Sequence, residues 1–179
     1  LFNLVIAGVL LFNQSILAEL GLDESVYRNA MAIYMGAGLL GNFLAGWLAR
    51  RWSLLRLMSI AMVLVACYLL LFARIDGATA AIWHAGLLGL SGGVVTVLFF
   101  TAWSKTFGRE HLGKIQGAAQ IFTVVASATG PWLLAYVFAS TGSYNPAFYL
   151  LTPAILAVAV AGWLTKLPRV PAPQGSIDE

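Results

Sequence analysis

Charged residues are scarce in this sequence of 179 residues. Asp, Glu, Lys and Arg together make up 9% of it, whereas 60% is hydrophobic. A soluble domain carries roughly 25% charged residues, because its surface has to face water. The deficit argues against a soluble globular fold, since even a large core needs a charged shell. It predicts a chain whose solvent is lipid.

Cysteines and metal-binding patterns are nearly absent as well. Cys67 is the single cysteine, so a disulfide within the chain is excluded. No CxxC or HExxH spacing occurs, and we expect neither a metal site nor a cofactor. The net charge is +3. In a membrane protein, an excess of basic residues reflects which loops face the cytoplasm and does not indicate a nucleic-acid partner.

Six apolar runs are each long enough to cross a bilayer, which takes about 20 residues. They predict an all-α integral membrane bundle over residues 1–165. The Pro-rich stretch that follows, 166–179, is predicted to be a disordered cytoplasmic tail. The six helices are expected at about 1–20, 24–48, 54–72, 78–104, 114–138 and 145–165.

Basic residues collect on one side of the predicted bundle. The positive-inside rule places this side in the cytoplasm. We therefore expect a multi-pass protein of the inner or plasma membrane, with its C-terminus in the cytoplasm. Arg28 and Arg74 fall on the opposite side. The cytoplasmic set is Arg50, Arg51, Arg56, Lys105, Arg109, Lys114, Lys166 and Arg169.

The predicted helices differ in polarity in a repeating order. Those at 54–72 and 145–165 are almost uniformly apolar, which predicts peripheral positions. The other four carry polar or small residues, which normally face the interior of a bundle. The order central, central, peripheral occurs twice and predicts a 3+3 repeat. Because each unit crosses the membrane an odd number of times, the two units would be inverted.

A polar stripe marks the fifth predicted helix. Gln116, Gln120, Thr123 and Ser127 follow at i, i+4, i+7 and i+11, a spacing that puts all four on one face. Such a stripe is unfavourable against lipid. It either lines a wet cavity or forms hydrogen bonds across a helix interface. The two long amides favour the cavity.

Other amides lie in the first two predicted helices. Asn13 and Gln14 form a weaker polar face on the first, where hydrogen bonds between helices and contact with a substrate are both open. Asn42 is a single amide on the second helix, and we expect it to be structural.

Glycine is frequent in the second and fourth predicted helices. Small residues let helix backbones approach closely, so we expect these glycines to pack. Gly130 and Pro131 are the candidate bend of the fifth helix, because proline removes an interior hydrogen bond. The glycines are Gly36, Gly38, Gly41, Gly46, Gly86, Gly89, Gly92 and Gly93.

Asp, Glu, Lys and Arg are missing from the middle of the predicted spans, and His84 is the candidate for a buried titratable group. This histidine lies roughly two turns into its helix, and an interfacial position and a proton or substrate role are both open. Residues 89–92 match the G-x-S-G of rhomboid-like proteases, which need a histidine on another helix. His84 precedes Ser91 on the same helix by roughly 10 Å, and His111 falls in a loop. We therefore do not expect an enzyme.

Two stretches on the predicted cytoplasmic side resemble loops of the major facilitator superfamily. Residues 46–51, Gly-Trp-Leu-Ala-Arg-Arg, are similar to its Gly-x-x-x-Asp-Arg-x-Gly-Arg loop, with Arg50 at the Asp position. Residues 107–117 resemble the loop before its eleventh helix. The resemblance implies a cytoplasmic gating role for four residues, Gly46, Arg50, Arg51 and Arg109.

Further matches narrow the resemblance. Residues 128–131 and 141–144 are similar to the end of the eleventh helix and the next loop in monocarboxylate and oxalate/formate transporters. The resemblance implies the second half of a twelve-helix fold, in which two halves rock around a central cavity. Because the chain begins at Leu1 inside an apolar run, we expect a C-terminal half whose N-terminal six-helix half is missing.

The function implied is secondary active transport of a small solute across the bilayer by alternating access. Organic anions are the candidate solutes and a proton is the candidate coupling ion. Two alternatives stay open: a non-transporting membrane assembly factor of the same fold, and a six-helix transporter that works as a homodimer.

Overall fold

The computed structural model describes residues 1–72, 75–107 and 112–165. Within these residues the chain forms six helices, each long and apolar enough to cross a membrane, which confirms the predicted all-α membrane fold. Helices are the expected outcome, because lipid offers backbone groups no hydrogen-bond partners. The helices are α1 (Phe2–Glu19), α2 (Glu24–Leu48), α3 (Leu54–Phe72), α4 (Ala78–Phe107), α5 (Leu112–Thr141) and α6 (Asn145–Leu164).

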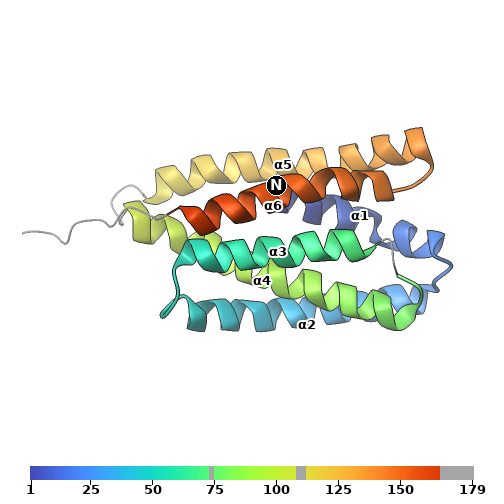
Figure 1. Ribbon diagram of the computed structural model, residues 1–179, viewed down its shortest axis with the longest axis horizontal. Coiled ribbons are helices and arrows are strands. Elements are labelled where there is room, and N and C mark those ends of the chain that lie inside the picture. The colour runs from blue at the N-terminus through green and yellow to red at the C-terminus, as the bar shows by residue number, and fades with distance from the viewer. Residues whose placement is uncertain (73–74, 108–111, 166–179) are drawn as a thin grey trace, which may run out of the picture.

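The helices differ in length and in where they begin. α4 and α5 have 30 residues each, or about 45 Å, and each continues three residues past its predicted end. They are longer than the hydrocarbon core, which is about 30 Å thick, so their ends reach the interface. α1 begins part-way along the bundle (Figure 1). The predicted tail, 166–179, lies outside the described residues.

The two ends of the bundle carry opposite charge. The α2–α3 connection, the C-terminal end of α4 and the N-terminal end of α5 lie at one end of the bundle (Figure 1). We call it the basic end, because five described cations lie there: Arg50, Arg51, Arg56, Lys105 and Lys114. At the other end, the acidic end, lie Arg28 and the four acidic residues that the structure describes: Glu19, Asp23, Glu24 and Asp76.

Tryptophan and arginine side chains meet at the basic end. The Arg51 guanidinium lies 5.3 Å from the centre of the Trp47 ring, and that of Arg56 lies 5.9 Å from the centre of the Trp163 ring. Both distances suit a cation–π contact. Tryptophan and basic residues together are typical of a membrane–water boundary.

Helix contacts follow an inverted repeat. α2 packs mainly against α4, α1 against α5, and α3 against both α6 and α4. In a 3+3 repeat, α1, α2 and α3 correspond to α4, α5 and α6 respectively. The α1–α5 pair then corresponds to the α4–α2 pair, and the α3–α6 pair corresponds to itself. Because consecutive helices run in opposite directions (Figure 1), α4 is antiparallel to α1. These pairings agree with the predicted 3+3 arrangement, whereas the α3–α4 contact has no counterpart of similar extent between α6 and α1.

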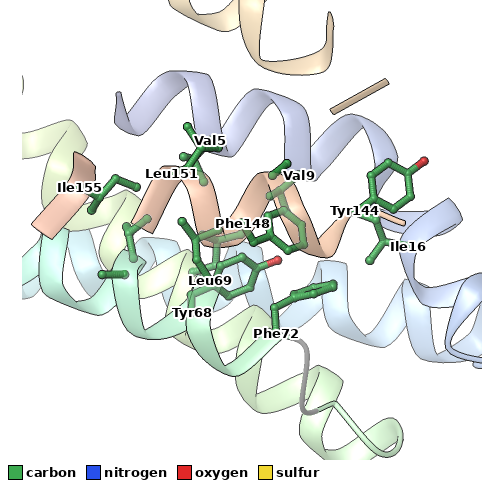
Figure 2. Close-up of a cluster of buried hydrophobic side chains, with 14 of the residues drawn as sticks. Val5, Val9, Ile16, Tyr68, Leu69, Phe72, Tyr144, Phe148, Leu151 and Ile155 are labelled. Carbon is green, nitrogen blue, oxygen red and sulfur yellow. The ribbon is translucent and has the colours of Figure 1, made fainter. Parts of the chain in front are cut away.

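The largest apolar core lies between α1, α3 and α6. Figure 2 shows Val9, Leu69 and Phe148 pointing toward one another from these three helices. The Phe72 and Phe148 rings meet edge to face with their centres 4.8 Å apart, a favourable geometry for aromatic pairs. Tyr144, before α6, completes the core at the acidic end.

Burial differs between the helices. α3 lies between α4 and α6 and buries about half of its residues. α2 and α5 are the least buried helices; Phe43 and Phe122, for example, are each 77% exposed. A uniformly apolar helix suits lipid and a protein core equally well, so polarity alone does not predict how deeply α3 is buried.

Glycine contacts hold α2 against α4. A Cβ atom on Gly89 would run into the Tyr34 carbonyl, and one on Gly93 into the Gly38 carbonyl. In the same way, a Cβ on Gly41 would meet the Leu90 carbonyl. The two backbones thus touch where only hydrogen occupies the side-chain position.

We predict that Gly93→Ala destabilises the fold. The added methyl must push two backbones apart, and overpacking of this kind costs about 1–3 kcal/mol, or roughly 2–10 °C in melting temperature. Thermal unfolding in detergent measures the effect. Gly36→Ala is the matched control, because a Cβ there meets no atom within 4 Å. Equal melting temperatures for both variants would contradict the close contact.

Candidate functional site

A cavity of about 500 Å³ opens between α1, α2, α4 and α5. Its wall contains no described residue of α3 or α6, so the four helices that the sequence predicts to be central are the ones that line it. Apolar side chains and glycines form most of the wall. Its polar members are Asn3, Tyr34, Asn42, Thr96 and Ser127.

The glycine contacts also shape this cavity. Gly38 of α2 and Gly89, Gly92 and Gly93 of α4 belong to its wall. Gly89 and Gly93 bring the helices together, whereas a Cβ on Gly92 would approach only side-chain atoms, the Phe2 ring at 3.6 Å and the Tyr34 hydroxyl at 3.8 Å. Gly92 therefore keeps space free inside the cavity.

Two oxygen atoms in the cavity wall can accept a hydrogen bond from a ligand. The Oδ1 atom of Asn42 is buried and has no hydrogen-bond partner within the described residues. The Thr96 hydroxyl donates to the Gly92 carbonyl at 2.9 Å, so its oxygen keeps only acceptor capacity. A buried acceptor without a partner is unfavourable by about 1–3 kcal/mol. The Asn42 amide is therefore the group most in need of a ligand.

The predicted polar stripe on α5 reaches the cavity at one residue. Ser127 lines it, whereas Gln116, Gln120 and Thr123 do not. Thr123 donates to the Ala119 carbonyl within its own helix. Because the stripe shares one helix face, Gln120 and Gln116 continue the Ser127 face toward the basic end, and Gln120 is exposed. A role for the two glutamines stays a prediction.

The amides of α1 and α2 take different positions relative to the cavity, and a substrate role for Asn13 and Gln14 stays a prediction. Asn13 is 9% exposed and packs in the bundle, Gln14 is exposed, and neither lines the cavity. Asn42, which we expected to be structural, lies in the wall instead. Tyr34 and Thr96 gave no signal in the sequence, since one tyrosine and one threonine in an apolar helix are unremarkable. The α2–α4 glycine contact is what brings them together.

The candidate bend has a packing role in the structure. α5 is continuous through Pro131. A Cβ on Gly130 would run into the Leu4 carbonyl of α1, so Gly130 is the point where α1 and α5 touch. A bend at these two residues stays a prediction.

His84 and Ser91 are each packed within the described helices. His84 packs its ring against Tyr68 and Phe72 of α3, with ring centres 5.9 and 6.5 Å apart, and its buried Nδ1 has no partner within the described residues. Ser91 is fully buried and donates to the Leu88 carbonyl at 2.8 Å. Its hydroxyl is therefore directed into its own helix and not toward a base. His111 lies outside the described residues.

The predicted gating loop is tied to α4. The Lys105 ammonium donates to the Ala49 carbonyl at 3.2 Å and so joins the basic ends of α4 and α2. Arg50 is exposed, Arg51 covers Trp47, and Gly46 has open space around it. Arg109 lies outside the described residues. A gating role for these residues stays a prediction.

We predict that Lys105→Met loosens the basic end of α2, because the substitution removes the donor that holds the Ala49 carbonyl. Hydrogen–deuterium exchange over residues 47–55 should become faster than in the unmodified protein. Lys114→Met, which removes a cation from the same end on α5, should leave this exchange unchanged. Equal exchange in both variants would contradict the tie.

Comparisons with known proteins agree with this architecture. The family model of the Major Facilitator Superfamily matches residues 1–179. No curated protein and no solved structure matches the chain, so the resemblance to monocarboxylate and oxalate/formate transporters stays a prediction. The family match spans all six membrane helices and the cavity between them, and the chain therefore belongs to the Major Facilitator Superfamily, a family of transporters.

Proposed function

We propose that this chain is the C-terminal half of a secondary active transporter, which moves a small solute by alternating access. The cavity between α1, α2, α4 and α5 carries the proposal. Its volume of about 500 Å³ falls within the range of small-molecule sites, about 300–1,000 Å³. Mostly apolar walls with a few convergent polar groups are also typical of such sites.

The outer faces of α2 and α5 support a second half as partner. Gln120 is exposed, and a bare amide against lipid is unfavourable. A second six-helix half that covers α2 and α5 would close the cavity and separate the Gln116–Ser127 stripe from lipid. Rocking of the two halves around the cavity would then expose it to each side in turn.

Ion coupling needs a group outside the cavity wall. The described wall residues include no Asp, Glu, Lys, Arg or His. His84 is the candidate that this half offers for a coupling proton. It packs against α3, on a face of α4 that does not line the cavity. It would therefore act by changing the position of α4 and not by contact with the solute.

We propose further that the protein lies in the inner or plasma membrane and that its basic end faces the cytoplasm. Among the described residues, five cations lie at that end against one at the acidic end, and this asymmetry supports the orientation.

The orientation predicts that a green fluorescent protein fused after Glu179 is fluorescent, and that an alkaline phosphatase fused there is inactive. Fusions after Asp76, at the acidic end, should behave in the opposite way. The two reporters expressed in a bacterial host measure this directly. Active phosphatase at the C-terminus would reverse the assignment.

Substitutions in the cavity are expected to slow transport. Asn42→Ala and Ser127→Ala each remove one hydrogen bond to the solute, and we expect about 3- to 10-fold lower kcat/KM for uptake into proteoliposomes. Gly92→Leu should abolish uptake by filling the cavity, while its melting temperature stays close to that of the unmodified protein. Gln116→Ala and Gln120→Ala test the stripe in the same assay.

Asn29→Ala is the control, because it removes an exposed amide from the same helix outside the cavity. Normal uptake by Gly92→Leu in a correctly folded protein would rule out this cavity as the solute path. Normal uptake by both glutamine variants would remove them from the site and leave the cavity in place.

A further inference from the structure

The geometry of the cavity points to an uncharged solute that carries several hydroxyl or amide N–H donors, with the Asn42 amide as its principal acceptor. This inference rests on the proposed function, because it assigns a solute class to the same cavity. It differs from the organic anions that the resemblance implies.

Charge is the first argument. The described wall holds no Asp, Glu, Lys, Arg or His side chain. Arg28 on α2 lies about 9 Å along the helix axis from Tyr34, and Lys105 on α4 about 14 Å from Thr96. Arg28 is exposed and already paired with Glu24 at 3.0 Å. An ion buried without a partner is strongly unfavourable, so this half is built to receive a neutral group.

Hydrogen-bond polarity is the second argument. The unpaired Asn42 Oδ1 and the Thr96 oxygen, whose proton is engaged by Gly92, both call for donors. Asn42 lines the cavity, and rotation of its amide about the Cβ–Cγ bond would bring the buried oxygen to the cavity. Hydroxyl and amide N–H groups supply such donors without a net charge.

The shape of the wall is the third argument. The Phe2 ring and the Tyr34 hydroxyl flank the open space above Gly92. A solute with an apolar carbon framework and polar groups at its edge would lie between these side chains and Asn42. The cavity volume of about 500 Å³ leaves room for a molecule of monosaccharide size.

Solutes matched in shape but not in charge test the inference. The full-length protein is incubated with three sets of solutes, each of which has a neutral, an anionic and a cationic member in that order. The sets are glucose, gluconate and glucosamine; glycerol, glycerate and serinol; and nicotinamide, nicotinate and 3-picolylamine. Binding is measured as thermal stabilisation and transport as uptake into proteoliposomes. We expect the neutral member of at least one set to bind about tenfold or more tightly than its charged partners.

Two substitutions link the preference to Asn42. Asn42→Ala should weaken binding of the neutral member about 3- to 10-fold, whereas Asn29→Ala should not. Asn42→Asp keeps an acceptor and adds a negative charge, so it should shift the preference to the cationic member of the set. A merely structural asparagine would not change charge preference, so this variant stays informative even if Asn42→Ala folds poorly.

Each outcome separates the inference from the proposed function. Uptake of an anionic or cationic member in preference to the neutral one would overturn the solute class and leave transport standing. Binding of a neutral member without any flux would support the solute class and contradict transport. Absence of stabilisation by every neutral member would overturn the inference.

Discussion

The direct contact between the α2 and α4 backbones is the constraint on which this structure depends. Gly89 and Gly93 meet the Tyr34 and Gly38 carbonyls where any Cβ would collide. In lipid no hydrophobic force drives helices together, so close packing of small residues has to hold them. The same contact brings Asn42 and Thr96 into one cavity wall and leaves Gly92 open to the cavity. One packing interaction therefore determines both the fold of this bundle and the chemistry of its wall.

Hydropathy was sufficient to predict the six helices, because each apolar run must hydrogen-bond its own backbone in lipid. The 3+3 arrangement also followed from sequence, since polar helices gather around the cavity and apolar ones stay behind it. Hydropathy could not distinguish lipid from protein as the surroundings of α3, which is uniformly apolar and yet largely buried. For an all-apolar helix, the two environments are equivalent in transfer free energy.

The cavity was harder to predict than the fold. Periodicity identified the α5 stripe, and Ser127 indeed lies in the wall, but periodicity describes one helix at a time. Asn42 and Thr96 are isolated in their own helices and become a site only when α2 and α4 touch. How closely the α2 and α4 backbones approach depends on which glycines face each other. The rotation of each helix about its axis decides this, and it cannot be read from the sequence of either helix alone.

The proposed function gives this chain two polar surfaces. In the cavity wall, the Asn42 oxygen has no partner within the described residues and the Thr96 proton is engaged by its own helix, so both oxygens accept hydrogen bonds from a solute. The α5 stripe carries long amides, which both donate and accept. Under the proposed function, such amides suit a surface that is wetted and covered in alternation. The charges stay at the membrane boundaries, where Arg51 and Arg56 contact tryptophan rings. Motion of this half would thus carry no bare charge across the hydrocarbon core, where its transfer is unfavourable by several kcal/mol.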